Sequence, residues 1–225
     1  MAAVVFDMDG VLVDVSGSFR ACIPLTVQAL GGTAVGDGEV QALKNGGGFN
    51  NDWDVTRELL RRQGIEVGRE RVVEVFSGIY RGAPGMGVYG AEGLIHRERW
   101  LLPAQRLAAL AERFELAVFT GRPRADAEFT LRLNGAREAM AAVMALEDAA
   151  AKPDPDGLRQ LAARVGKLRA YVGDTVDDAR CAAAAGVAFV GVCPRGSELE
   201  GLFRAAGAQW TAASAVEAAE FLLAD

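Results

Sequence analysis

The stretch Val4-Val5-Phe6-Asp7-Met8-Asp9-Gly10-Val11-Leu12-Val13-Asp14 decides the fold of this chain. Its apolar opening is typical of a strand that is buried on both faces of a parallel sheet. Two carboxylates follow at once, and a carboxylate at a buried edge needs a metal ion or a charged partner. Because ligands bind at the carboxyl ends of strands in open parallel sheets, Asp7 and Asp9 are the first candidates for a functional site.

Two different patterns follow this stretch. Between residues 15 and 90, helical segments alternate with glycine-rich connections, and no strand pattern is present. From Pro103 onward, short strand-like segments alternate with helical ones, which predicts right-handed crossovers and a parallel sheet with helices on both faces. We therefore predict an α/β core built from residues 1–14 and 91–225, interrupted by an all-helical domain at residues 15–90.

The composition of the 225 residues narrows the class of protein. A formal net charge of −6 and a pI near 5.0 argue against a nucleic-acid surface, which needs a basic patch. No apolar run approaches the roughly 18 residues of a membrane span, and the N-terminus lacks the basic region of a signal peptide. The three cysteines are scattered without C-x-x-C spacing, which is typical of reduced thiols. We expect a cytoplasmic monomer or homodimer, with no nucleic-acid or membrane partner.

Polar segments also follow later predicted strands. They are Thr120-Gly121-Arg122, Lys152-Pro153-Asp154-Pro155 and Gly173-Asp174-Thr175-Val176-Asp177-Asp178. The carboxyl ends of parallel strands meet at one edge of a sheet, so these segments should lie near the first two aspartates. Several carboxylates alone would repel one another, whereas a divalent cation with oxygen ligands, above all Mg²⁺, would hold them together. A lysine and a threonine hydroxyl suit a phosphoryl group, whose oxygens need positive charge and donors.

The four blocks Asp-Met-Asp-Gly-Val-Leu, Thr-Gly, Lys-Pro and Gly-Asp-Thr-x-x-Asp occur along the chain in this order. In that order and at these separations, the sequence resembles the haloacid dehalogenase-like (HAD) superfamily, in the branch (subfamily IA) whose helical C1-type cap follows the first motif. The resemblance covers the whole chain. It implies a Rossmannoid core with an inserted helical cap. It also implies a Mg²⁺-dependent phosphatase that hydrolyses a small phosphorylated metabolite through an aspartyl-phosphate.

The resemblance also implies roles for individual residues. Asp7 would be the nucleophile that takes the phosphoryl group, and Asp9 would protonate the leaving oxygen and then activate water. Thr120 and the amide of Gly121 would hold phosphate oxygens. Lys152 would neutralise charge on the nucleophile and on the phosphoryl group.

The same resemblance implies a set of metal ligands. Mg²⁺ would be bound by Asp7, by the backbone carbonyl of Asp9 and by Asp174. Asp178 would be a further ligand or a neighbour of the ligands. Asp177 is the less favoured substitute, because an acid at a helix N-terminus is more often there for the helix dipole.

The segment Lys44-Asn45-Gly46-Gly47-Gly48-Phe49-Asn50-Asn51-Asp52-Trp53 is the most unusual part of the cap. Its glycines, amides and aromatic residues suit a loop that closes over a substrate, with Asn50, Asn51 and Trp53 as contacts. Alternatively, it is a helix connection in which Asn51 or Asp52 is an N-cap and Trp53 belongs to the cap core.

Two basic residues each have two interpretations. Arg122 directly follows the threonine block and is a candidate contact for an anionic group, or else a surface arginine. Lys44 is a candidate substrate contact, because some capped relatives that cleave carbon–phosphorus bonds form a Schiff base on a cap lysine. The alternative for Lys44 is an ordinary surface lysine.

Other activities of the fold remain open at this stage. Dehalogenases do not need the second aspartate, so Asp9 disfavours that branch. A phosphonate hydrolase, a phosphomutase or a non-catalytic regulatory member of the fold are the alternatives to a phosphatase. For the substrate, the segment before Trp53 is similar to a subgroup sometimes associated with histidine biosynthesis. Histidinol phosphate is therefore one hypothesis, and phosphoglycolate is another.

Overall fold

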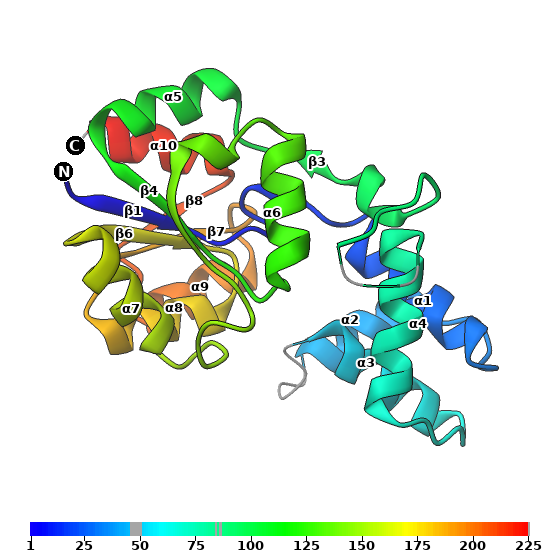
Figure 1. Ribbon diagram of the computed structural model, residues 1–225. Helices are drawn as coiled ribbons and strands as arrows, with labels where there is room; N and C mark the ends of the chain where they lie inside the picture. The colour runs from blue at the N-terminus through cyan, green and yellow to red at the C-terminus, as the bar shows by residue number, and fades with distance from the viewer. Residues whose placement is uncertain (46–50, 84, 86, 225) are drawn as a thin grey trace. The chain divides into compact units, whose positions relative to one another are not determined.

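A computed structural model describes residues 1–45, 51–83, 85 and 87–224 (Figure 1). The chain divides into two compact units. One contains Met1–Asp14 and Arg99–Asp225, and the other contains Val15–Glu98. The first boundary lies where the sequence places it, after residue 14.

The second boundary lies after Glu98 and not, as predicted, after Gly90. The hydroxyl groups of Ser18 and Tyr80, at opposite ends of the helical unit's sequence, both donate to Oε1 of Glu98, at 3.2 and 2.7 Å. A short 3₁₀ helix, η1 (Leu94–Arg97), precedes this carboxylate. These long-range contacts hold the segment before Arg99 in the helical unit, and a local sequence pattern does not show them.

The larger unit is built on a six-stranded parallel sheet with the order β5-β4-β1-β6-β7-β8. This confirms the predicted α/β class. The strand β1 lies in the middle, and its four residues are fully buried. The end of β1 therefore opens between the ends of its two neighbours. The strands are β1 (Ala3–Phe6), β4 (Glu115–Phe119), β5 (Met140–Met144), β6 (Leu168–Gly173), β7 (Phe189–Val192) and β8 (Trp210–Ala212).

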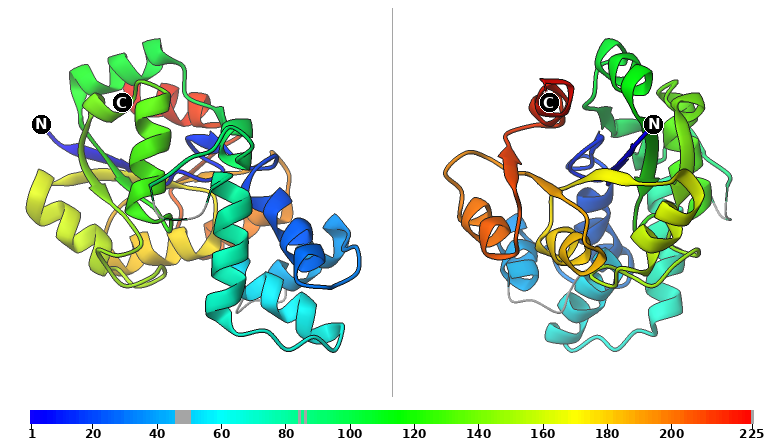
Figure 2. Two further views of the ribbon diagram at one scale, coloured as in Figure 1. Left: turned by 45° about the vertical axis from the view of Figure 1, so that its right-hand side comes forward. Right: turned by 90° about the vertical axis from the view of Figure 1, so that its left-hand side faces the viewer.

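Helices cover both faces of this sheet (Figures 1 and 2). On one face lie α5 (Ala104–Arg113) and α10 (Ala215–Ala224). On the other lie α7 (Asp156–Val165), α8 (Val176–Ala185) and α9 (Glu198–Ala205). The connection from β4 to β5 contains α6 (Arg124–Leu133) and the 3₁₀ helix η2 (Arg137–Ala139).

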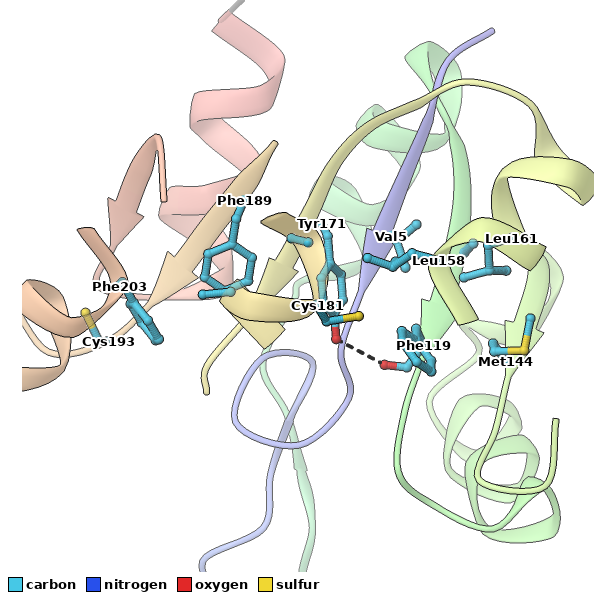
Figure 3. Packing of buried hydrophobic residues seen from close by; sticks show 13 residues of the cluster. Val5, Phe119, Met144, Leu158, Leu161, Tyr171, Cys181, Phe189, Cys193 and Phe203 are labelled. Carbon is cyan, nitrogen blue, oxygen red and sulfur yellow. Dashed lines mark hydrogen bonds between the residues drawn. The ribbon is translucent and has the colours of Figure 1, made fainter. Parts of the chain in front are cut away.

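A row of aromatic rings fills one side of the sheet (Figure 3). Phe203, Phe189, Tyr171 and Phe119 follow one another, with ring centroids 5.5, 5.9 and 6.1 Å apart. Offset and edge-on aromatic contacts of this kind add to the free energy of area burial. Tyr171 is the only one of the four that carries a hydroxyl, and this hydroxyl reaches the polar edge described below.

In its described residues, the smaller unit contains helices and connecting loops but no strand. Its helices α1, α3 and α4 pack on one another, and α2 packs on α3. Phe76 of α4 is at the centre of the packing, because the rings of Phe19 and Trp53 both lie against it. The helices are α1 (Phe19–Ala29), α2 (Asp37–Asn45), α3 (Asp52–Arg62) and α4 (Arg69–Arg81).

A two-stranded antiparallel ribbon was not predicted. It pairs β2 (Val13–Asp14) with β3 (Arg99–Trp100), and the side chains of Asp14 and Arg99 form an ion pair. Each strand has two residues, which is too short for a periodic sequence pattern. The two chain crossings between the units are thus paired with each other.

Two expectations about the chain as a whole can be compared with the structure. All three cysteines are buried and carry free thiols. No helix in the described part of the chain has the length and apolar character needed to span a membrane.

The contact between Gly191 and Phe203 provides a test of the core packing. A Cβ at Gly191 would lie 2.2 Å from the buried ring of Phe203, so we expect Gly191→Ala to lower the free energy of unfolding by about 1–3 kcal/mol. Gly201→Ala is the matched control, because a Cβ there meets open space on a helix, and we expect it to stabilise the protein by about 0.5–1 kcal/mol. Urea denaturation measures both, and equal stabilities would contradict the packing shown here.

Candidate active site

Asp7 is placed directly by the central strand. Its backbone N–H donates to the carbonyl of Val172 at 2.8 Å, which extends the pairing of β1 with β6 by one residue. Its Oδ1 accepts a hydrogen bond of 2.7 Å from the amide of Met8. The residue is only 6% exposed. Burial, opposed by Lys152, raises the pKa of Asp7 from 3.8 to about 7, with Asp178 and Asp9 adding to the rise.

The turn after Asp7 brings a second carboxylate close. Gly10 has a φ of 75°, and a Cβ on it would lie 1.9 Å from Oδ2 of Asp174. Glycine is therefore required twice at this position, for the left-handed backbone and for the close approach. The second reason depends on the position of Asp174 and is visible only in the tertiary structure.

Three carboxylates converge at this edge of the sheet. One oxygen each of Asp7, Asp174 and Asp178 lies within 4.8 Å of the other two. Burial raises the pKa of Asp174 well above its ordinary value, and the charges of Asp7 and Asp178 raise it further. When all three carboxylates are ionised, their mutual repulsion destabilises the site. A bound cation would relieve this repulsion.

Lys152 supplies a positive charge inside this cluster. Its Nζ lies 2.7 Å from Oδ1 of Asp178 and 3.2 Å from Oδ1 of Asp7. It also donates a hydrogen bond of 2.9 Å to the hydroxyl of Tyr171, and it lies over the rings of Phe119 and Tyr171. Burial alone would lower the pKa of Lys152, but Asp178 and Asp7 outweigh it and raise the pKa. The lysine therefore stays charged.

Four donor groups of the protein hold the carboxylate of Asp178. Its Oδ1 accepts from Lys152 and, at 2.7 Å, from the hydroxyl of Tyr171. Its Oδ2 accepts from the amide and the hydroxyl of Thr175, at 3.0 and 2.6 Å. Burial would raise the pKa of Asp178, yet Lys152, Thr175 and Tyr171 outweigh it and lower the pKa. Asp178 is the ionised anchor of the cluster.

The structure also separates Asp178 from its neighbour in sequence. Asp178 is fully buried and belongs to the carboxylate cluster. Asp177 instead forms an ion pair of 3.4 Å with the exposed Arg180. Of the two acids that the sequence leaves open, Asp178 is therefore the one at the candidate metal site.

Thr120 follows β4, the other neighbour of the central strand. Its amide donates to the carbonyl of Met144 at 2.9 Å, and the residue is 2% exposed. Its Oγ1 accepts a hydrogen bond of 3.2 Å from the amide of Arg122. Gly121, by contrast, is exposed, and a Cβ there would meet open space. The backbone bends directly after Thr120, at the edge of the sheet.

Arg122 is not a surface arginine, and it contacts a carboxylate of the protein. The residue is 1% exposed. Its Nε donates to Oδ1 of Asp9 at 2.6 Å, and its Nη2 lies 2.5 Å from the same oxygen. The hydroxyl of Thr130, on α6, accepts from Nη1 at 3.0 Å. The sequence predicts a contact with an anion, and the structure shows that this anion is a carboxylate of the protein itself.

Comparison with known proteins identifies the family. The family model described as haloacid dehalogenase-like hydrolase matches residues 1–186. The chain belongs to this family. A curated relative from Phytophthora nicotianae, named imidazoleglycerol-phosphate dehydratase, is 33% identical over 199 residues. The match covers 84% of this chain and 43% of the relative, so this HAD hydrolase spans less than half of that protein's length.

Solved structures with low sequence identity share the fold. A predicted phosphoglycolate phosphatase from Haemophilus somnus is 18% identical with a TM-score of 0.79, covering 99% of this chain and 98% of that one. A HAD-superfamily hydrolase of subfamily IA from Geobacter sulfurreducens is 22% identical with a TM-score of 0.68, covering 99% and 96%. The predicted HAD-like architecture is therefore confirmed.

The cap residues proposed as substrate contacts of this HAD hydrolase have other partners. Asn51 is the N-cap of α3, where its Oδ1 accepts from the amide of Asp54 at 2.8 Å. Trp53 is 9% exposed and packs edge-on against Phe76. The cap-core alternative therefore describes both residues better than the substrate-facing loop. Asn50 lies outside the described residues, as does the side chain of Lys44, whose backbone lies in the last turn of α2.

Sequence reasoning did not identify Tyr171 or Thr175 as part of the site. Tyr171 interrupts an apolar strand with a hydroxyl, and buried tyrosine hydroxyls usually have a partner. Thr175 and Asp178 form a capping box at the start of α8, with bonds in both directions. The spacing Thr-x-x-Asp is visible in the sequence, but the meeting of Tyr171 with this box requires the sheet register.

The donor set fits a hard divalent cation. Asp7 and Asp174 each contribute an oxygen to the cluster, and both carboxylates have raised pKa values. Asp178 is already occupied by Lys152, Tyr171 and Thr175, so it is better suited to orienting the site than to being a main ligand. All donors are oxygens, which is the chemistry that Mg²⁺ prefers.

A cation at this site should stabilise the fold in a pH-dependent manner. The raised pKa of Asp7 means that the folded chain without metal holds a proton up to about pH 7, whereas the unfolded chain loses it near 3.8. This carboxyl group therefore lowers stability as the pH rises through that window, and metal binding reverses the effect by replacing the proton. We expect saturating Mg²⁺ to raise Tm by about 5 °C at pH 8 and by much less at pH 5.5.

Differential scanning fluorimetry in Mg²⁺ and in EDTA measures this difference. Asp174→Asn should lose most of the Mg²⁺-dependent shift, because it removes one carboxylate of the cluster. Asp177→Asn should keep the shift, because that acid pairs with Arg180 on the surface. A shift of equal size at both pH values would contradict competition between the metal and protons.

Proposed function

We propose that this HAD hydrolase is a Mg²⁺-dependent phosphatase that forms an aspartyl-phosphate on Asp7. The observation that carries the proposal is the ion pairing of Asp7 with Lys152 at 3.2 Å, beside Asp174 and Asp178. A nucleophilic carboxylate, a fixed cation and a metal-type acidic cluster at one edge of the sheet suit the transfer of a phosphoryl group. A regulatory member of the fold would not need all of these groups together.

In the first step, an oxygen of Asp7 would attack phosphorus while the bond to the leaving oxygen breaks. Lys152, held by Asp178 and Tyr171, would oppose the negative charge that gathers on the transferring oxygens. Asp9 would give its proton to the leaving oxygen, so that the product leaves as an alcohol. The hydroxyl of Thr120 and the amide of Gly121 would donate hydrogen bonds to the phosphate oxygens.

In the second step, Asp9 would take a proton from water as the water attacks the aspartyl-phosphate. The bond between Asp7 and phosphorus would break, inorganic phosphate would leave, and both aspartates would return to their starting forms. Bound Mg²⁺ would supply positive charge beside the phosphoryl oxygens and would lower the pKa of the carboxyl group of Asp7.

For the substrate, we propose an imidazole-bearing phosphate monoester, with histidinol phosphate first. The support is the curated relative, whose name refers to a phosphate ester of an imidazole compound and which is 33% identical to this chain. Phosphoglycolate is the second hypothesis, but the neighbour with that description is 18% identical and shares only the fold with this chain. Under both hypotheses, the substrate would be a small phosphorylated metabolite.

Replacement of the nucleophile tests the reaction. We expect wild-type protein with Mg²⁺ to release phosphate from 4-nitrophenyl phosphate, and Asp7→Asn to reduce the rate by at least about 10⁴-fold. Asp177→Asn is the control and should stay within about fivefold, because exposed ion pairs contribute about 1 kcal/mol or less. Malachite-green detection of phosphate measures both. Full turnover by Asp7→Asn would rule out the aspartyl-phosphate.

A metabolite panel at fixed Mg²⁺ tests the substrate. We expect kcat/KM for histidinol phosphate to exceed that for phosphoglycolate by at least about tenfold, because pocket contacts to a ring contribute about 1.4 kcal/mol or more. The reverse order would favour the second hypothesis. Phosphonoacetaldehyde with borohydride belongs in the same panel, since covalent trapping on Lys44 would establish the phosphonate hydrolase alternative instead.

A further inference from the structure

Outside the Lys152 cluster, a buried arginine, Arg122, contacts Asp9. Two nitrogens of one guanidinium group meet a single oxygen, Oδ1 of Asp9, at 2.6 and 2.5 Å. The third nitrogen, Nη1, donates to the hydroxyl of Thr130 at 3.0 Å. The arginine is 1% exposed, whereas the aspartate side chain is 37% exposed. The buried arginine therefore holds the side chain of the more exposed aspartate.

Burial of the Arg122 side chain costs free energy. A guanidinium group loses its hydration inside a protein, and the loss is offset only when its donors are satisfied in a fixed geometry. Arg122 offsets part of this loss through the contacts of Nε and Nη2 with Asp9 and through the hydrogen bond of Nη1 with Thr130 on α6. Because the residue is 1% exposed and already contacts a carboxylate of the protein, it is not placed to be a main contact for a substrate phosphate.

We propose that Arg122 is a positioning residue that reserves Oδ2 of Asp9 for proton transfer. The proposal rests on the function proposed above, in which Asp9 gives and takes the proton. Guanidinium nitrogens only donate hydrogen bonds, so the oxygen they contact must be an acceptor. In the acid form of Asp9, the proton therefore sits on Oδ2 and not on Oδ1.

This arrangement also restricts the rotation of the carboxyl group. The terminal torsion of an aspartate is broad, so an unrestrained carboxyl group presents either oxygen to the substrate. A fork of two nitrogens on one oxygen holds the plane of the group, whereas a single ammonium group could not. Holding the acid in one orientation before the substrate arrives is a substantial part of general acid–base catalysis.

The chemistry assigned to Oδ2 is balanced over the cycle. As the bond from phosphorus to the leaving oxygen breaks, the Oδ2–H proton moves to that oxygen and an alcohol is released. Oδ2, now ionised, then takes one proton from the attacking water while the bond from Asp7 to phosphorus breaks. Water and the phosphate ester are consumed, and the alcohol and phosphate are produced.

The test compares two leaving groups in Arg122→Ala and Arg122→Lys. Nitrophenolate leaves without a proton, whereas an alkoxide does not, so only the alkyl ester needs the oriented acid in the first step. With an alkyl phosphate that the wild type hydrolyses, we expect kcat to fall by about 10²–10⁴-fold while KM changes less than about threefold. With 4-nitrophenyl phosphate, stopped-flow absorbance should show a fast burst of about one nitrophenolate per enzyme, followed by slow turnover.

Rescue distinguishes orientation from charge. Guanidinium chloride at tens of millimolar should restore part of the alkyl phosphate activity of Arg122→Ala, while methylammonium at the same concentration should not. Arg122→Lys keeps the charge without the fork and should remain impaired. Circular dichroism and Tm identify variants that do not fold. If Arg122→Ala is one of these, Thr130→Val carries the test, because it keeps the arginine and removes only the hydroxyl that accepts from Nη1.

Thr130→Val should lower kcat for the alkyl phosphate several-fold more than it lowers the nitrophenolate burst. An equal loss in kcat for the alkyl phosphate and in the rate of the nitrophenolate burst, or a KM raised tenfold with kcat unchanged, would show that Arg122 acts on the phosphate and would overturn the positioning role. Unchanged kinetics in folded variants would overturn it as well. A wild-type protein that hydrolyses no phosphate ester would instead refute the proposed function, and the positioning role with it.

Discussion

The structure of the candidate site depends on one interaction, the burial of the Lys152 ammonium group among carboxylates. Its Nζ contacts Asp178 at 2.7 Å and Asp7 at 3.2 Å, at a sheet edge where all three side chains are largely buried. Three carboxylates without this charge would resist burial together, and the lysine without them would lose its proton. Tyr171 and Thr175 complete the bonding of Asp178. The hydroxyl of Tyr171 thus connects the row of aromatic rings to the polar groups of the candidate site.

A second buried cation separates the two aspartates of the first turn. Lys152 forms an ion pair with Asp7, and Arg122 donates a hydrogen bond to Asp9. Each carboxylate has its own positive partner, and the partners differ in kind. The ammonium group is a compact charge, which in the proposed reaction would suit a carboxylate that gains and loses a phosphoryl group. The guanidinium group is a planar fork, which suits a carboxyl group that must keep one orientation.

Much of the candidate site could be predicted because its sequence blocks are local. Asp7, Thr120, Lys152 and Asp174 each stand at or shortly after the end of a strand, and strand ends of a parallel sheet share one edge. The cap contacts were less successful, because Asn51 and Trp53 suit a binding loop and a packed helix start equally well in composition. Arg122 was recognised as a partner for an anion, but which anion depends on a contact between residues 113 positions apart.

The sequence by itself determined the fold class, the order of the motifs and the residue types at the sheet edge, since these follow from local hydrophobic patterning and from short blocks. Only the tertiary structure decided the pairings. It joined Glu98 to the helical unit, paired Val13–Asp14 with Arg99–Trp100, chose Asp178 over Asp177, and placed Arg122 on Asp9. The reason is physical: propensity and periodicity act over a few residues, whereas the partner of a buried charge is set by which chain segments are neighbours in space.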